Sequence, residues 1–136
     1  EGWYPFDWYV HSLDIIELLV KKNGYSVASR IGYKRSQNVG FLKNTDAVKD
    51  PVWVLKKVQK NWTMYYNFGA VHVQNVSDTG ADYIISDYAG ARPFCERMNG
   101  FLKGLLREVT GLKEATVEET SCRCRGDDSC KFEIRW

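Results

Sequence analysis

The first 42 residues carry apolar side chains at helical spacing. From Pro5, which suits a helix start, the spacing predicts a helix that stops at Asn23-Gly24. Its apolar positions are Phe6, Tyr9, Val10, Leu13, Ile16, Leu19 and Val20. The next segment, residues 25–42, holds two interior glycines, and we expect one or two short helices there.

A third helix is predicted after a polar linker over residues 43–50. Asp50 suits the N-cap because its carboxylate can accept hydrogen bonds from the free backbone amides of the first turn. Pro51 suits the first helical position, where no amide donor is needed. The apolar face that follows consists of Val54, Leu55, Val58, Trp62 and Tyr65.

The pattern then changes from helical to strand-like. One strand is expected around Val71 and Val73, and a second from Tyr83 to Tyr88. The Ser-Asp-Thr-Gly sequence over residues 77–80 would join them by a turn. These segments therefore predict a β-hairpin.

A fourth helix is predicted over about residues 93–109, closed by Gly111. Its inward face would consist of Cys95, Met98, Leu102, Leu105 and Leu106. Gly100 and Gly104 leave little side-chain bulk on this helix, and we expect them to allow close packing on a sheet.

The chain ends in a second predicted hairpin, from Ala115 to about Cys124 and from Cys130 to Trp136. In its last strand, apolar and charged residues alternate, so one face is expected to be buried. The order of helices, hairpin, helix and hairpin predicts an α+β fold, with an antiparallel sheet of two hairpins packed against about four α-helices.

Composition narrows the class of protein. The chain has 136 residues, 44% of them hydrophobic, with a net charge of +2. These values favour one globular domain over residues 1–136, without a basic stripe for direct nucleic-acid binding. No stretch approaches the roughly 20 apolar residues that a membrane span needs. Because the chain opens without Met, we expect a domain cut from a longer protein; its size removes the need for disulfides, which favours reduced cysteines and a cytoplasmic location.

Candidate chemistry is concentrated near the C-terminus. Cys122, Cys124 and Cys130 lie within nine residues around a predicted turn, and Cys95 lies on the inward face of the fourth helix. The hairpin would place Cys122 opposite Cys130, where the two sulfurs can bind a metal or form a disulfide. Glu119 can supply an oxygen ligand. On spacing alone, a metal site, a disulfide and plain core thiols all remain open.

Strand geometry leaves the ligand set undecided at this point. Residues two apart share a strand face, which places Glu118 rather than Glu119 on the side of the cysteines. A bulge near residues 120–121 would bring Glu119 to that side instead. Spacing therefore leaves open which glutamate binds, and whether Cys95 or Cys124 completes the set.

Two runs of this sequence resemble the 4-vinyl reductase domain family. The run that is similar to its closing signature is Glu119-x-x-Cys122-x-x-x-Gly126-Asp127-x-x-Cys130-x-Phe132-x-Ile134. The run that is similar to the preceding helix is Pro93-Phe94-Cys95-x-x-x-x-Gly100-Phe101-x-x-Gly104. The resemblance covers roughly residues 50–136. It implies a ligand-binding α+β module related in fold to vesicle-tethering TRAPP subunits, found in phenol-responsive transcription activators and in bacteriochlorophyll biosynthesis.

The resemblance also implies a zinc site. In the phenol sensors of the family, zinc is held by a helix cysteine, a glutamate and two hairpin cysteines, which correspond here to Cys95, Glu119, Cys122 and Cys130. Cys124 would then be a bystander. Four protein ligands leave no open coordination position, so the Zn²⁺ is expected to be structural.

A ligand pocket is a further expectation. The chain has 5 Trp, 8 Tyr and 6 Phe, more than a core of this size requires. The candidate ligand-binding residues are Trp53, Trp62, Tyr65, Tyr66, His72 and Tyr83. For His72, a surface-facing strand position is the favoured interpretation, because Val71 and Val73 occupy the other face. The His and Trp pair of the phenol sensors cannot be placed in register here, so phenol specificity is not expected.

These features favour a sensory domain that binds a small hydrophobic or aromatic molecule and signals to a fused or partner output module, as a homodimer. We do not expect an enzyme, because the sequence has no dinucleotide-binding glycine motif and no nucleophile–base arrangement. Two alternatives are an enzyme or accessory protein in tetrapyrrole vinyl reduction, and a purely structural dimerisation domain.

Overall fold

The computed structural model describes residues 5–20, 26–42 and 49–136. Within them the chain forms four α-helices and a four-stranded antiparallel sheet, which confirms the predicted α+β fold. The helices are α1 (Phe6–Val20), α2 (Val27–Ser36), α3 (Pro51–Lys60) and α4 (Arg92–Gly104). The strands are β1 (Ala70–Ser77), β2 (Gly80–Ser86), β3 (Thr116–Ser121) and β4 (Cys130–Arg135).

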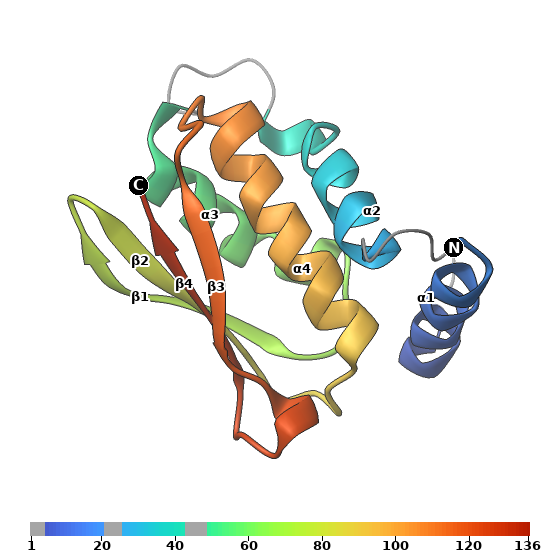
Figure 1. Ribbon diagram of the computed structural model, residues 1–136. Coiled ribbons are helices and arrows are strands. Elements are labelled where there is room, and N and C mark those ends of the chain that lie inside the picture. Colours follow the sequence, from blue (N-terminus) through green and yellow to red (C-terminus); the bar gives the residue numbers. More distant parts are fainter. Residues whose placement is uncertain (1–4, 21–25, 43–48) are drawn as a thin grey trace.

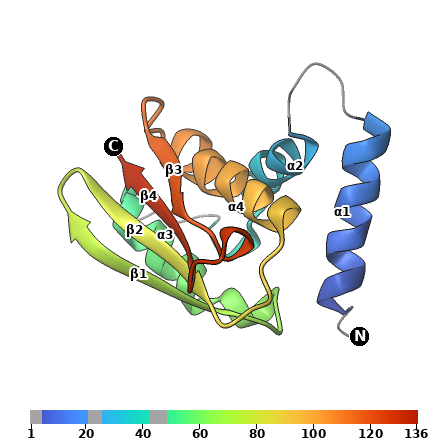
Figure 2. The same cartoon turned by 60° about the horizontal axis from the view of Figure 1, so that its bottom comes forward.

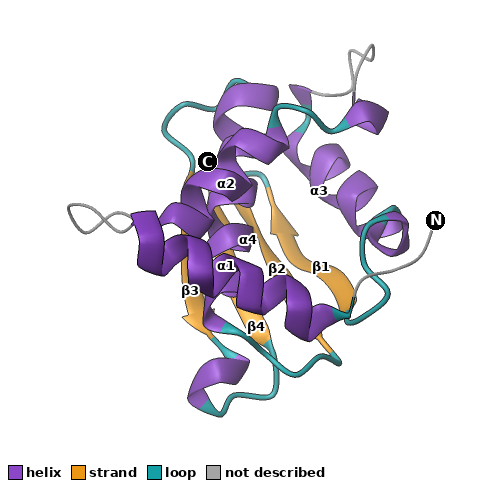
Figure 3. Ribbon diagram, turned by 90° about the vertical axis from the view of Figure 1, so that its right-hand side faces the viewer, coloured by secondary structure: helices purple, strands orange, loops and turns teal. Residues whose placement is uncertain are grey.

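The sheet has the order β1-β2-β4-β3, so the second strand of each predicted hairpin lies in the centre (Figure 1). Tyr83 on β2 pairs with Val73 on β1 and with Phe132 on β4, and all pairings are antiparallel. Helices α2, α3 and α4 cover one face of this sheet (Figures 2 and 3). The buried side chains of that face are Val71, Ala81, Tyr83, Ile85, Val117, Cys130, Phe132 and Ile134.

The predicted start of α3 is confirmed. The Asp50 carboxylate accepts hydrogen bonds from the backbone amides of Val52 at 2.9 Å and Trp53 at 3.3 Å, and Pro51 opens the helix. The predicted apolar face is buried as far as Trp62, but Tyr65 is 40% exposed. The helix ends at Lys60 and a 3₁₀ turn follows, so helical spacing no longer places Tyr65 on that face.

The fourth predicted helix is also confirmed. α4 continues without a break into a π-helical turn, Leu105–Val109, and Gly111 follows at a φ of +84°. All five side chains of the predicted inward face are buried: Cys95, Met98, Leu102, Leu105 and Leu106.

The glycines of α4 pack against α2, whereas the sequence suggested packing on the sheet. A Cβ built on Gly100 would lie 1.9 Å from the backbone oxygen of Ser29, and one on Gly104 would lie 2.1 Å from the Ser36 hydroxyl. From the other side, a Cβ on Gly32 of α2 would lie 1.9 Å from the Arg97 carbonyl oxygen. The two helices therefore cross at backbone contact, which only glycine permits.

Helix α1 is the outermost element, beyond α2 and α4 (Figures 1 and 2). Phe6 at its start contacts the core through Phe68, with ring centroids 4.2 Å apart. Trp8 and Leu18 are 68% and 81% exposed. The predicted stop at residues 23–24, and residues 43–48 of the predicted linker, lie outside the described residues.

None of the helices in the described ranges combines the length and the apolar character needed to cross a membrane.

The helix crossing gives a first prediction. Gly32→Ala should lower the free energy of unfolding by at least about 2 kcal/mol, because the new methyl group meets backbone that cannot move aside. Urea denaturation measures this, with Gly40→Ala as the matched control. A Cβ on Gly40 meets no atom within 4 Å, so its change should stay within about 0.5 kcal/mol. Equal stabilities of the two variants would contradict the crossing.

Candidate functional site

A bulge in β3 selects the glutamate that faces the cysteines. Glu119 pairs with Phe132 and Ser121 pairs with Lys131, so Thr120 is the extra residue between them. The bulge lies where the sequence required one, and it turns the Glu119 side chain inward. Glu118 is exposed instead. After the strand, the Asp127 carboxylate accepts a hydrogen bond from the Cys122 amide at 2.7 Å and closes the turn.

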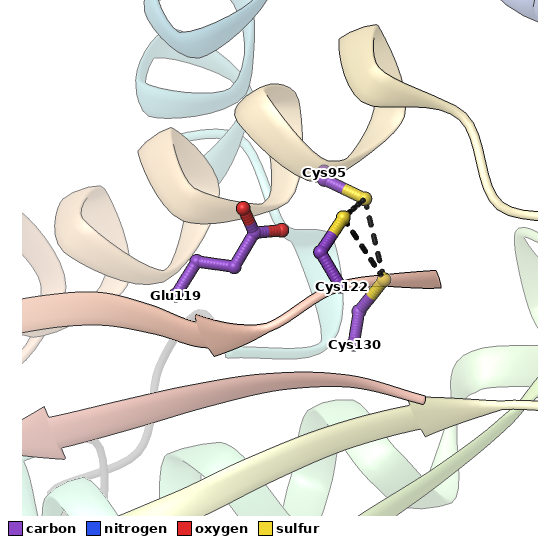
Figure 4. Close-up of side chains that lie close together, drawn as sticks. All are labelled: Cys95, Glu119, Cys122 and Cys130. Carbon is purple, nitrogen blue, oxygen red and sulfur yellow. Dashed lines mark hydrogen bonds between the residues drawn. The ribbon is translucent and has the colours of Figure 1, made fainter. Parts of the chain in front are cut away.

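The structure brings Cys95, Glu119, Cys122 and Cys130 together, as Figure 4 shows. One ligand atom from each lies within 4.8 Å of the others. Cys95 is on α4, Glu119 on β3, Cys122 directly after β3, and Cys130 at the start of β4. Cys124 is exposed and is not part of this cluster. The open choice between Cys95 and Cys124 is thus settled in position by the fold.

The sulfur spacing fits a tetrahedral metal site. The Sγ atom of Cys95 lies 3.4 Å from that of Cys130 and 3.6 Å from that of Cys122, and the last two are 3.8 Å apart. Four ligands in a tetrahedron with bonds of about 2.3 Å have edges of about 3.8 Å. A disulfide would need about 2.05 Å, and the three cysteines are free thiols here. The spacing is therefore that of thiolates around a small cation.

The thiols also share their protons unequally. Hydrogen bonding from Cys95, the Tyr88 hydroxyl and the Arg123 amide lowers the pKa of Cys130 to about 6, against the opposing effect of burial. Burial raises the pKa of Cys122 to about 12. Cys95 acts as a proton donor toward Cys130, which raises its own pKa. One thiolate is thus favoured already, and a divalent cation would take the place of the remaining protons.

Glu119 has one satisfied and one unsatisfied oxygen. Its Oε2 atom lies 2.6 Å from Arg92 Nη1 and 3.6 Å from Arg125 Nη1. Its Oε1 atom is buried and has no hydrogen-bond partner. A buried carboxylate oxygen without a partner is costly, and a metal ion at the cluster would satisfy it. The two guanidinium groups would offset the charge in excess when four anionic ligands bind one divalent ion.

Tyr88 joins the cluster to an aromatic core. Its hydroxyl lies 2.8 Å from the Cys130 sulfur and 3.4 Å from the Cys95 sulfur. Its ring lies 5.5 Å from that of Phe94, centroid to centroid, and the Phe94 ring lies 5.6 Å from that of Tyr66. Sequence reasoning placed Tyr88 beside a strand but gave it no role. A tyrosine seven residues before a helix cysteine carries no spacing signal, since only the fold joins them.

Tyr66 lines a cavity between α2, α3 and α4. The cavity offers about 40 Å³ to the centres of water molecules, more than one water requires. A wider cleft of about 230 Å³ shares four of its residues and reaches Phe6 and Tyr9 of α1. The cavity is lined by Arg35, Val39, Val58, Trp62, Tyr65, Tyr66, Arg97, Met98 and Phe101.

Three of the six predicted ligand-binding residues line this cavity, namely Trp62, Tyr65 and Tyr66. Tyr83 is fully buried on β2 and does not line it, and Trp53 lies on α3 with the Lys57 ammonium group 5.7 Å from its ring. His72 is exposed on β1, as the strand alternation indicated. The other histidine of the chain, His11, is exposed on α1.

Sequence reasoning missed the two arginines of the cavity, Arg35 and Arg97. Both lie on helices whose other basic residues face solvent, for example Arg30 and Lys34, so charge alone could not separate them. Their positions opposite the apolar faces of α3 and α4 could have been recognised only by placing α2 against α4.

Comparison with known proteins confirms the family resemblance. The family model of the 4-vinyl reductase domain matches residues 81–136, which include all four residues of the cluster. A vinyl-4-reductase family protein from Methanocaldococcus jannaschii has a similar structure, with a TM-score of 0.61 and 18% identity over 99% of this chain and 83% of its own. Among curated proteins, none matches this sequence.

Two H-NOX structures share the fold as well. An H-NOX protein from S. oneidensis in the Fe(II)NO ligation state has a TM-score of 0.69 and 13% identity, over 98% of this chain and 77% of its own. The IWP-051-bound H-NOX from Shewanella woodyi in the Fe(II)CO ligation state has a TM-score of 0.62 and 14% identity, over 98% and 73%. At these identities, the likeness shows the fold.

The geometry predicts which side chains hold a metal. Cys122→Ser and Glu119→Gln should reduce bound metal well below one ion per chain, whereas Cys124→Ser and Glu118→Gln should retain it, because only the first two reach the cluster. Cys122→Ser should also lower the free energy of unfolding by about 3 kcal/mol or more. Elemental analysis and urea denaturation measure both effects. Metal loss in Cys124→Ser with retention in Cys122→Ser would overturn the assignment.

Proposed function

We propose that this domain senses a small apolar molecule, and that a structural zinc ion fastens its C-terminal hairpin to α4. The observation that supports sensing best is the aromatic cavity between the helices. Cavities of this kind, mostly apolar with a few placed polar groups, are typical of small-molecule sites. The solved structures with this fold include proteins with Fe(II)-bound NO and CO, which fits a role in small-molecule binding.

The dimensions favour a compact ligand. The enclosed part and the adjoining cleft together suit a molecule with one ring, and both are small beside the several hundred Å³ of a typical ligand site. A tetrapyrrole would need a much larger space. The two histidines of the chain also lie exposed on α1 and β1, away from the cavity. We therefore favour sensing over the alternative in tetrapyrrole vinyl reduction.

Zinc is the metal that the ligand set suits best. Three thiolates and one carboxylate are soft and borderline donors, and the tetrahedral spacing of the sulfurs fits Zn²⁺. Four protein ligands leave no position for substrate or for an activated water, which supports a structural and not a catalytic ion. Free thiols at these positions also suit a reducing compartment such as the cytoplasm.

Signalling would pass through α4. This helix carries Cys95 on the cluster and, one to two turns later, Arg97, Met98 and Phe101 on the cavity. A ligand that shifts these side chains acts on an element already held at one end by the metal. We infer that the signal reaches a fused or partner output module and that the domain itself does not contact nucleic acid.

A homodimer is the expected assembly, and α1 offers a surface for it. Trp8, Ile15 and Leu18 share one side of this helix, and all three are exposed, with Leu18 at 81%. Contiguous exposed apolar residues commonly mark interaction sites. A second copy of the chain would cover them and place the two cavities on either side of the interface.

The cavity predicts a fluorescence response to a neutral ring. Benzyl alcohol should give a saturable change in tryptophan emission in the wild type and in Trp53→Phe, because Trp53 does not line the cavity. The same titration should lose most of its signal in Trp62→Phe. A response that is absent from the wild type, or unchanged in Trp62→Phe, would contradict the proposed binding site.

The surface of α1 predicts the oligomeric state. In sedimentation velocity, the wild type should be a dimer and Leu18→Glu a monomer, because a carboxylate cannot be buried unpaired in an apolar interface. Lys60→Glu, an exposed position on α3, serves as the control and should remain a dimer. A monomeric wild type, or a dimeric Leu18→Glu, would rule out this interface.

A further inference from the structure

Two guanidinium groups lie at the opening of an otherwise apolar cavity. Arg97 on α4 and Arg35 on α2 both line the cavity and the adjoining cleft. Arg97 donates a hydrogen bond to the Tyr66 hydroxyl, and its guanidinium carbon lies 5.5 Å from the centroid of the Tyr9 ring. Arg35 lies 6.0 Å from the centroid of the Tyr65 ring. Aromatic faces thus hold both cations in place.

Neither arginine has a carboxylate partner within the described part of the chain. Arg92 pairs with Glu96 and Glu119, and Arg135 pairs with Glu133, so paired arginines are common elsewhere in this domain. No Asp or Glu is present among the described residues that line the cavity or the cleft. Glu96 precedes Arg97 directly, but its carboxylate binds Arg92 and the Ser26 hydroxyl.

The position of Arg97 makes this absence informative. Its side chain is half-buried between α1, α4 and the segment that carries Tyr66. A guanidinium group removed from water normally gains an anionic partner, because desolvation is costly without one. Tyr66 and the ring faces supply neutral contacts only.

An unsatisfied hydroxyl lies beside these cations. The Tyr9 hydroxyl is buried without a hydrogen-bond partner, and Tyr9 lines the cleft below Arg97. Burial raises the pKa of Tyr9 further than Arg97 lowers it, so this hydroxyl stays protonated and remains a donor. A donor and two cations therefore surround the same opening, which is an arrangement complementary to an acceptor with negative charge.

We infer that the ligand of this domain is a compact organic carboxylate, with its apolar ring in the cavity and its carboxylate on Arg97 and Arg35. This inference rests on the proposed sensing function and specifies its ligand class. The planar fork of a guanidinium group matches a carboxylate with two parallel hydrogen bonds, which a neutral alcohol or phenol cannot reproduce. The lining residues Trp62 and Phe101 would contact the ring.

The test compares benzoate with benzyl alcohol by isothermal titration calorimetry at neutral pH and low salt. The two probes share a ring and differ in charge. Wild-type protein should bind benzoate at least about tenfold more tightly, since hydrogen bonds to charged groups are the stronger ones. Higher salt should weaken benzoate binding and leave benzyl alcohol binding unchanged.

Three variants locate the charge that matters. Arg97→Gln and Arg35→Gln should each reduce the affinity for benzoate several-fold and bring the two probes closer together. Arg35 is exposed, so this variant keeps the fold even if Arg97→Gln proves unstable. Arg30→Gln is the matched control, because Arg30 is exposed on the same helix but lines neither the cavity nor the cleft. It should bind both probes as the wild type does.

The outcomes separate this inference from the function on which it rests. Equal affinity of the wild type for both probes would overturn the carboxylate and leave the sensor intact. Failure of both probes to bind would overturn both proposals. A preference for benzoate that survives in both Arg97→Gln and Arg35→Gln would also reject the assigned arginines.

Discussion

The approach of three sulfurs and one carboxylate to within 4.8 Å of one another is the constraint on which the C-terminal half of this fold depends. These groups come from α4, from β3 and its extension, and from β4, which are otherwise joined by packing alone. Without a cation, protons must hold the thiols together and one carboxylate oxygen stays buried without a partner. With a cation, the same groups become a tetrahedral link between helix and hairpin.

Helix α4 connects this link to the cavity. Its glycines allow α2 to approach at backbone contact, and that approach brings Arg35 across from Arg97. Its inward residues contact the aromatic core, where Phe94 packs against both Tyr66 of the cavity and Tyr88 of the cluster. Because these contacts are continuous, a ligand in the cavity and a metal on the hairpin bear on the same helix. The geometry thus gives a physical route for coupling between them.

Sequence reasoning succeeded where the controlling interactions are local. The Asp50 cap, the inward face of α4 and the alternation of β4 each depend on residues within one or two turns, and all are found in the structure. Strand parity even required the bulge at Thr120 before any fold was known. The failures concern tertiary contacts. The partner of Gly100, the exposure of Tyr65 and the arginines of the cavity depend on how helices meet, which no single periodicity records.

Native mass spectrometry of the purified protein, with no metal added, tests the central claim most directly. The account predicts one zinc ion per chain on fully reduced protein, with any copurified organic molecule visible as additional mass. A chain without metal whose mass is short by the two hydrogens that each disulfide removes would contradict the account. The cluster would then be a set of oxidised cysteines, and the hairpin would be held to α4 by covalent bonds instead of a metal.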